Sequence, residues 1–134
     1  MAVERTYIML KPDCLKRKLI GKVISRIEEK GYAITNMKTM NLSEGILREH
    51  YAHIADRPFF PEIVEYMTSG PVLAMIVEGE NVVKGMRILM GHTKFEEACA
   101  GTIRGDYAMS TSENIIHGSD SVENAEIEIN RFFG

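Results

Sequence analysis

Apolar residues along this chain fall into short runs and helical repeats separated by polar turns. Continuous apolar runs at 7–10, 72–77 and 115–116 predict buried strands. A segment rich in Thr, Met and Ile at 32–42 predicts a further strand with imperfect alternation. Lys11-Pro12-Asp13 closes the first run and predicts a polar turn at the end of that strand.

Helices are predicted between these strands, where apolar residues recur at i, i+3, i+4 and i+7. Ser43 is a candidate N-cap for a short helix that carries Leu47 and Tyr51, and Asp120 or Ser121 caps the last helix. The apolar faces of the longer helices are Ile20, Val23, Ile24 and Ile27; Ile63, Val64 and Met67; Val82, Val83, Met86, Leu89 and Met90; and Val122, Ala125, Ile129 and Phe132.

The order of these elements favours an α/β (α+β) fold with a βαββαβ core, a four-stranded sheet covered by helices on one face. A doubly wound parallel sheet is the alternative, because strand order is not visible in a sequence. The other face of the sheet must also be covered. If no helix covers it, other subunits would, so we expect an oligomer.

The chain has 134 residues and contains no linker or repeat, so we expect a single domain over residues 1–134. Periodicity fades from 92 to 113. An irregular stretch of this length in a small domain usually has a functional role.

Composition narrows the class of protein. The net charge of −3 argues against a dedicated nucleic-acid binder, since such proteins carry a strong basic excess. Cys14 and Cys99 are too few for a secreted disulfide framework, and Met1 to Arg5 does not begin a signal peptide. The run at 72–77 is far shorter than a membrane helix. We therefore expect a cytoplasmic protein without membrane spans.

His117 is the candidate nucleophile. It stands at the end of an apolar run and directly before Gly118, so its ring can face a cleft. His50 and His53 have an allowed metal-ligand spacing, with Asp56 nearby, but no further ligand completes a site, and we assign no metal ligand in the protein.

A nucleophilic imidazole must be neutral, with one nitrogen free and the other held by an acceptor. Glu128, about two turns into the last helix, is the candidate acceptor, and Ser119 is placed to orient its carboxylate. The N-terminus of that helix favours an incoming anion. A Ser-His-Asp hydrolase triad is not expected, because Ser119 and Asp120 directly follow His117 instead of converging on it from separate segments.

Phosphoryl transfer needs positive charge and hydrogen-bond donors around the moving group. Five polar residues at separate places in the chain provide them: Lys11, Arg87, Thr93, Arg104 and Asn114. Each alone is weak evidence, because a lone arginine or lysine is more often a solvated surface residue than a phosphate ligand. No GxxxxGK[ST] motif is present, so a P-loop is excluded.

Tyr51 and Phe59 are candidates for a platform on which a nucleobase stacks. Stacking does not read base edges, so such a site accepts many bases. The alternative is that Tyr51, Phe59 and Phe60 belong to the core.

From Thr6 to Phe133 the chain resembles nucleoside diphosphate kinases. Five strings in the family's order carry the resemblance. They are Met9-Leu10-Lys11-Pro12-Asp13, Asp56-Arg57-Pro58-Phe59-Phe60, Ser69-Gly70-Pro71-Val72, Gly101-Thr102-Ile103-Arg104-Gly105-Asp106 and Asn114-Ile115-Ile116-His117-Gly118-Ser119-Asp120-Ser121.

This resemblance implies a role for each candidate residue. His117 would carry the phosphoryl group, Glu128 would orient its ring, and Lys11 would also reach the ribose 3′-hydroxyl. Phe59 would stack on the base, and Tyr51 would pack beside the phosphates and the histidine. The implied contacts to phosphates and sugar hydroxyls are Lys11, Arg87, Thr93, Arg104 and Asn114.

The resemblance also implies a ferredoxin-like fold, magnesium bound mainly through the nucleotide phosphates, and dimers that build hexamers or, as a second possibility, tetramers. The substrates would be nucleoside triphosphates and diphosphates, with transfer in two steps through phosphorylated His117. The alternative is a non-catalytic nucleotide-binding or interaction protein on the same fold, which would usually have lost the histidine or a phosphate ligand.

The chain departs from the family pattern at several positions. Cys14 replaces a frequent glycine, and Lys94-Phe95 and Ala100 replace residues that are often Asn-Pro and Pro. The loss of these prolines is expected to affect stability and assembly and not catalysis. His53 stands at an often acidic position near the phosphates, and Thr111 near a position that is usually aliphatic.

Overall fold

The computed structural model describes residues 3–134 of the chain. The strands are β1 (Val3–Leu10), β2 (Ala33–Met40), β3 (Val72–Glu80) and β4 (Ile116–Gly118). The helices are α1 (Pro12–Lys16), α2 (Ile20–Glu29), α3 (Glu44–His50), α4 (Phe60–Met67), α5 (Val82–Met90), the 3-10 helix η1 (Phe95–Glu97), α6 (Ile103–Tyr107) and α7 (Val122–Phe133).

The strands form one antiparallel sheet in the order β2-β3-β1-β4. This order confirms the βαββαβ core and shows that the alternative, a doubly wound parallel sheet, is wrong. β1 lies between β3 and β4, and its second half is buried on both faces, which explains the continuous apolar run at 7–10. His117 in β4 lies directly opposite Met9 in β1, so the candidate nucleophile is anchored to the centre of the sheet.

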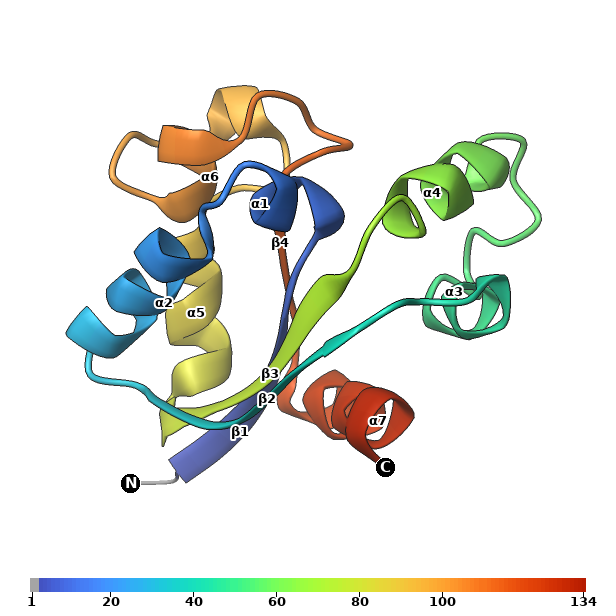
Figure 1. Cartoon of the computed structure of the whole chain (residues 1–134). Helices are drawn as coiled ribbons and strands as arrows, with labels where there is room; N and C mark the ends of the chain where they lie inside the picture. Colours follow the sequence, from blue (N-terminus) through green and yellow to red (C-terminus); the bar gives the residue numbers. More distant parts are fainter. Residues whose placement is uncertain (1–2) are drawn as a thin grey trace.

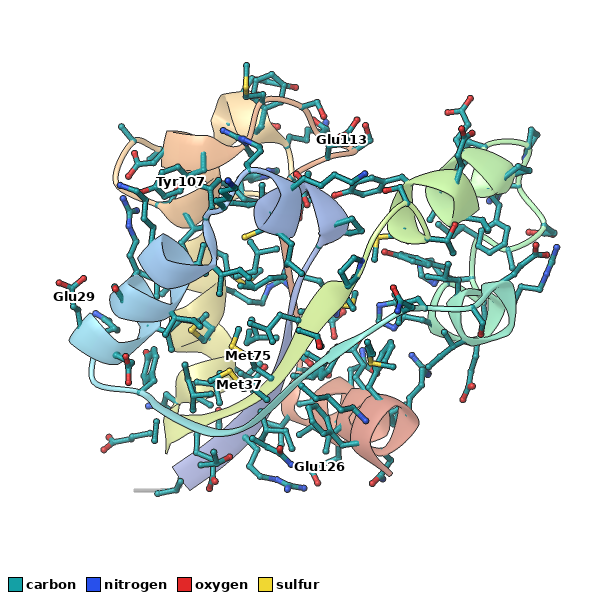
Figure 2. The ribbon with its side chains drawn as sticks, viewed as in Figure 1. Glu29, Met37, Met75, Tyr107, Glu113 and Glu126 are labelled. Atoms are coloured by element: carbon teal, nitrogen blue, oxygen red, sulfur yellow. The ribbon has the colours of Figure 1, made fainter. Side chains whose placement is uncertain are left out.

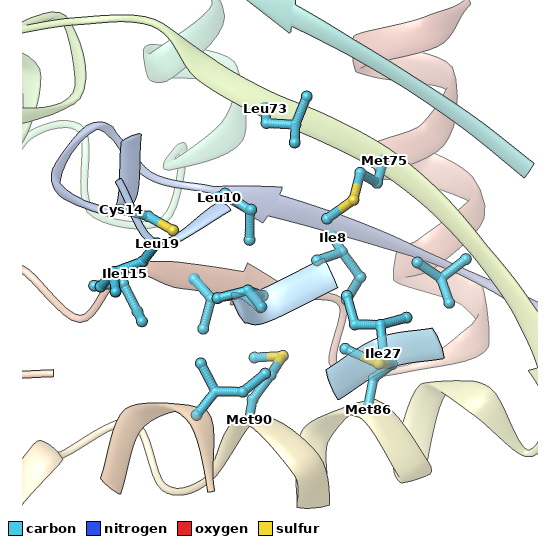
Figure 3. Close-up of a cluster of buried hydrophobic side chains, with 14 of the residues drawn as sticks. Ile8, Leu10, Cys14, Leu19, Ile27, Leu73, Met75, Met86, Met90 and Ile115 are labelled. Carbon is cyan, nitrogen blue, oxygen red and sulfur yellow. The ribbon is translucent and has the colours of Figure 1, made fainter. Parts of the chain in front are cut away.

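Helices cover both faces of the sheet, so the expectation of helices on one face was wrong (Figure 1). Alternate residues of β1 explain the two layers. Ile8 and Leu10 pack against α2 and α5 in one hydrophobic cluster, which Figure 3 shows in close-up. Tyr7 and Met9 point to the opposite face and pack against α3, α4 and α7. The sheet therefore gains its second cover from the same chain, and this expected reason for oligomerisation does not hold.

Two strands extend beyond their apolar runs. β1 begins at Val3, and β3 continues through Glu78-Gly79-Glu80, residues with low strand propensity. They pair with each other from Val3↔Glu80 onward, so the ladder overrides local propensity there. Figure 2 shows the other partner of β3, where Met37 of β2 lies beside Met75 in the same register.

The stretch expected to be irregular contains short elements. Thr102 caps α6, because its side chain accepts a hydrogen bond from the Gly105 N–H at 3.0 Å, and Ile103 is fully buried in the core. The predicted turn at Lys11-Pro12-Asp13 is instead the start of α1, with proline at its first position. Both helices have only five residues, too few for a periodic signal.

Candidate active site

The backbone before His117 turns sharply to place its ring. Ile115 has φ of 62°, and the Ile116 N–H donates to the Asn114 carbonyl at 2.8 Å, which closes a three-residue turn around a β-branched residue. A positive φ costs a β-branched residue roughly 1–3 kcal/mol, and burial of Ile115 in the core offsets this strain. The residue after His117 is a glycine, Gly118, because a Cβ at that position would lie 2.6 Å from the Met90 sulfur.

Glu128 holds His117 from α7. The His117 Nε2 lies 3.1 Å from both Glu128 oxygens, and the Ser119 hydroxyl donates to Oε1 at 2.5 Å. Burial alone would raise the pKa of Glu128. The hydrogen bond from His117, the positive charge that this ring carries when it is protonated, and the hydrogen bond from Ser119 hold that pKa below its usual value. An ionised Glu128 accepts from Nε2–H, so Nδ1 carries the lone pair.

The capping of α7 sets this spacing. Ser121 is the N-cap, since its side chain accepts from the Asn124 N–H at 3.1 Å, whereas Asp120 accepts from the Asn124 side chain. Of the two predicted caps, Ser121 is therefore correct. Ala125, Ile129 and Phe132 pack on the sheet, and Glu128 is left on the flank that faces His117.

A cleft of about 670 Å³ lies in front of His117. Its lining includes nine of the ten residues proposed from the sequence once the adjoining cavity with Phe59 is counted: Lys11, Tyr51, Phe59, Arg87, Thr93, Arg104, Asn114, His117 and Glu128. The tenth, Ser119, is buried, and its hydroxyl donates to the Glu128 carboxylate. The fold thus brings together residues that are up to 117 positions apart in sequence, from Lys11 to Glu128.

Arg104 is the most deeply held of the cations, with 5% of its surface exposed. Nη1 donates to the Gly91 carbonyl at 3.0 Å and Nη2 to the Ile116 carbonyl at 2.7 Å, while Nε has no acceptor among residues 3–134. Burial, followed by repulsion from Arg87, lowers its pKa to about 10. It therefore remains charged at neutral pH, and an anion in the cleft would relieve the repulsion.

Lys11 leaves the end of β1 and enters the same cleft. Its Nζ donates to the Asn114 side-chain oxygen at 2.8 Å, and the Asn114 amide donates to the Thr93 carbonyl at 3.2 Å. Burial, and then the positive charge of Arg104, lower the pKa of Lys11 to about 8. Asn114 thus connects three segments and fixes the lysine where the strand ends.

Of the two aromatic candidates, Tyr51 is half-buried and packs against the core, whereas Phe59 stands apart from it. Phe60 is 2% exposed and packs in the core, whereas Phe59 is 47% exposed and lines a second cavity of about 640 Å³ that adjoins the first. Tyr51, Lys11 and Thr93 line both cavities, and Thr111 lines the second. The interpretation of Phe60 as core was right, and Phe59 is free to stack on a flat ligand.

The metal pairing of His50 and His53 with Asp56 does not form. Within residues 3–134, His50 instead groups with His117 and Glu128, whose ligand atoms lie within 4.8 Å of one another. Two nitrogens and one carboxylate suit zinc better than magnesium, which prefers an octahedron of oxygens. His53 is exposed at the rim of the first cleft.

Two further residues, His50 and Arg131, lie beside His117 and Glu128 and were not predicted from the sequence to do so. His50 lies edge-on to His117, with ring centroids 4.8 Å apart, and Arg131 lies on α7 three residues after Glu128. Arg131 lines the cleft, and its Nη1 lies 2.9 Å from His50 Nδ1. The i, i+3 spacing from Glu128 to Arg131 was a usable signal, since it places both on one helix face.

The sequence profile of nucleoside diphosphate kinases matches residues 4–134. The chain belongs to the nucleoside diphosphate kinase family. It is 53% identical to a nucleoside diphosphate kinase of Exiguobacterium sibiricum, covering 98% of this chain and 95% of the relative. It is 52% identical to human nucleoside diphosphate kinase A, covering 97% of this chain and 86% of the relative.

Solved structures of the nucleoside diphosphate kinase family agree with the fold. The Encephalitozoon cuniculi enzyme superposes with a TM-score of 0.94 at 51% identity, covering 98% of this chain and 89% of that one. The Halobacterium salinarum enzyme, solved in complex with CDP, superposes with a TM-score of 0.94 at 45% identity, covering 98% of this chain and 88% of that one. The family, the ferredoxin-like fold and the enzyme class predicted from the sequence are therefore confirmed.

Proposed function

We propose that this chain transfers the γ-phosphoryl group of a nucleoside triphosphate to a nucleoside diphosphate through phosphorylated His117. One observation carries the proposal. Glu128 holds Nε2 of His117 with both oxygens at 3.1 Å, which leaves the Nδ1 lone pair for a cleft lined by Lys11, Arg87 and Arg104. A held imidazole in front of three cations suits phosphoryl transfer better than passive binding.

The reaction has two matched halves. Nδ1 of His117 attacks the γ-phosphorus, the bond from that phosphorus to the bridging oxygen breaks, and the nucleoside diphosphate leaves. A second nucleoside diphosphate then attacks phosphohistidine with a terminal oxygen, and Nδ1 regains its lone pair. Lys11, Arg87 and Arg104 offset the charge that spreads over the moving group, which is the largest source of catalysis in such transfers.

Magnesium is proposed to enter as part of the nucleotide substrate. The His50, His117 and Glu128 donors do not suit it, and the Glu128 oxygens already accept from His117 and Ser119. Bound to the phosphates, the ion would neutralise part of their charge. We therefore propose no protein ligand for this magnesium ion.

Labelling with γ-labelled ATP and magnesium tests the proposal directly. After a short incubation and a quench, an acid-labile, base-stable label on His117 that ADP or GDP removes would establish both halves. An unlabelled but folded protein that still binds nucleotide would favour the alternative, a non-catalytic binding protein. Of the family residues proposed from the sequence, His117 and the phosphate contacts are all present, which favours the enzyme.

We propose a broad choice of base. Phe59 offers an exposed aromatic face and, with Thr111, lines the cavity where a base would lie. The Halobacterium relative was solved with a pyrimidine nucleotide, CDP. ATP and CTP are expected to phosphorylate the protein at similar rates, and strict selectivity for one base would exclude Phe59 as the platform.

Among residues 3–134, every helix is too short or too polar to span a membrane.

We propose a homo-oligomer, with a hexamer favoured over a tetramer. β2 is an edge strand with mostly exposed residues, a surface through which subunits could associate. Light scattering would distinguish six from four times the chain mass of 15.1 kDa.

We also propose a cytoplasmic location and no nucleic-acid partner. Cys14 and Cys99 are both free, and burial raises the pKa of the Cys14 thiol to about 12, so that thiol stays protonated. Two unpaired thiols fit a reducing compartment. The net charge of −3 fits small anionic substrates held by a local cluster of cations.

The pKa of Lys11 predicts an alkaline limit to activity. Because burial and Arg104 lower it to about 8, the amine loses its charge as pH rises through that value. We expect kcat/KM to fall about tenfold per pH unit above roughly pH 8. Lys11→Arg keeps its charge, so in that variant the fall should move above pH 9. An unchanged profile in Lys11→Arg would assign the limit to another group.

Removing Glu128 should slow transfer without abolishing it. In Glu128→Ala, His117 keeps its place in β4 but loses the acceptor that fixes its tautomer. Loss of the carboxylate that orients a metal-bound histidine costs about 10–100-fold, and we expect a loss of that order here. Single-turnover phosphorylation would measure it, with Glu126→Ala as the matched control. Glu126 lies on the same helix (Figure 2), but it is exposed and pairs with Arg5. A rate equal to the unaltered protein would show that Glu128 does not hold the ring.

A further inference from the structure

Two imidazoles flank the Glu128 carboxylate. His117 Nε2 lies 3.1 Å from both of its oxygens, and His50 Nδ1 lies 3.8 Å from Oε2. The His50 ring is buried and stands edge-on to the His117 ring at an interplanar angle of 80°. At 3.8 Å, His50 Nδ1 lies just outside hydrogen-bond range of the same carboxylate, so the two histidines are potential competitors for Glu128.

Arg131 contacts Nδ1 of His50, the same nitrogen that would otherwise compete for Glu128. Its side chain is 13% exposed, and its Nη1 lies 2.9 Å from His50 Nδ1. A guanidinium has only donors, so Nδ1 must accept and His50 must be the neutral tautomer with its proton on Nε2. An Nδ1 that accepts from Arg131 cannot donate to Glu128.

Protonation of His50 would place a hydrogen on Nδ1 and so remove its ability to accept from Arg131. The groups around the ring disfavour this charged form. The groups that face the ring are His117 from β4, Glu128 and Arg131 from α7, and Lys11 from the end of β1. Burial, followed by repulsion from His117, lowers the pKa of His50 to about 3, against the opposing attraction of Glu128. The imidazole is therefore neutral over the range in which a histidine nucleophile works.

We propose that Arg131 is a positioning residue that fixes the tautomer of His50 and so reserves Glu128 for His117. The inference rests on the proposed function, because it assigns Glu128 the task of holding the nucleophile. It gives α7 two linked roles. Glu128 orients His117, and one turn later Arg131 prevents the neighbouring imidazole from drawing that carboxylate away.

Arg131 also lines the cleft, so direct contact with nucleotide phosphates is the competing explanation. Its ion pair with exposed Glu49 is 3.5 Å long and does little to hold it. The two explanations differ in what His50 does. If Arg131 acts through His50, removing the ring nitrogens should remove the effect of Arg131, whereas a direct phosphate contact would not depend on His50.

A double-mutant cycle separates these cases. Phosphoenzyme formation from ATP and magnesium is measured in single turnovers for the unaltered protein, Arg131→Met, His50→Phe and the double variant. Met keeps the length of the side chain without donors, and Phe keeps a ring without nitrogens. Arg131→Met should slow the step about tenfold at unchanged KM for ATP. In the His50→Phe background the same change should alter the rate less than about twofold.

Equal losses in both backgrounds, or a rise in KM on Arg131→Met, would overturn the inference. So would an unchanged rate in Arg131→Met. If either variant fails to fold, ¹⁵N spectra of the histidines in the unaltered protein decide the question. His50 should show an unprotonated Nδ1 and a protonated Nε2 from pH 6 to 8. A protonated Nδ1 overturns the inference without reference to activity.

These measurements also separate the inference from the proposed function. If the unaltered protein forms no phosphohistidine, the proposed function fails, and the spectra still report the tautomer. If it forms phosphohistidine at a rate that Arg131→Met does not change, only the inference about Arg131 fails.

Discussion

His117→Ala should eliminate phosphoryl transfer and leave a folded protein that still binds nucleotides. Removal of the nucleophile from a covalent mechanism leaves no intermediate to form, and losses of about 10⁴-fold or more are typical. The phosphates would still meet Lys11, Arg87 and Arg104 in the cleft. Rapid-quench assays of ATP-to-GDP transfer would measure the loss, and calorimetry with ADP would measure binding.

Stability should change little in this variant. The His117 side chain is 23% exposed, and its loss leaves Glu128 with the Ser119 hydroxyl as a partner. Loss of one such hydrogen bond costs about 1–2 kcal/mol, a shift of several degrees in Tm at most for a domain of this size. Transfer at even a tenth of the unaltered rate would refute the covalent route. Collapse of the fold would instead show that the imidazole is structural.

Much of the fold could be predicted because its elements are long and have one apolar face. α2, α5 and α7 each follow the helical repeat, and the buried half of β1 is a continuous apolar run. The second cover of the sheet was not predictable, since strand order decides which side chains share a face. The polar end of β3 was missed for a similar reason, because pairing with β1 holds residues of low strand propensity.

The contacts within the site likewise divide into those that sequence spacing predicts and those that depend on tertiary packing. His117, Ser119 and Glu128 belong to one short supersecondary unit, strand then helix, so their sequence spacing fixes their geometry. The relation of His50 to Arg131 spans 81 positions and depends on how α3 and α7 lie against the same sheet face. A local pattern carries no information about such a contact, and His50 suggested only a metal spacing with His53.

Arg104→Met should damage both activity and stability. In transfer, an arginine that faces the moving phosphoryl group is worth about 10³-fold or more. In the fold, the same guanidinium satisfies the buried carbonyl of Ile116 and that of Gly91. Each carbonyl left without a donor costs about 1–3 kcal/mol, so loss of both donors should lower the free energy of unfolding by about 2–6 kcal/mol. That is a large part of the stability of a typical domain.

Arg87→Met provides the matched control for this prediction. Arg87 lines the same cleft but is exposed, and within residues 3–134 its side chain makes one hydrogen bond, to the Gly118 carbonyl, which is longer at 3.2 Å. Its loss should lower transfer, and because it leaves one carbonyl without a donor instead of two, the free energy of unfolding should fall less than in Arg104→Met. Rapid-quench rates and urea unfolding of both variants give the comparison. If Arg104→Met unfolds no more easily than Arg87→Met, the two carbonyls find other donors, and the guanidinium of Arg104 serves the substrate alone.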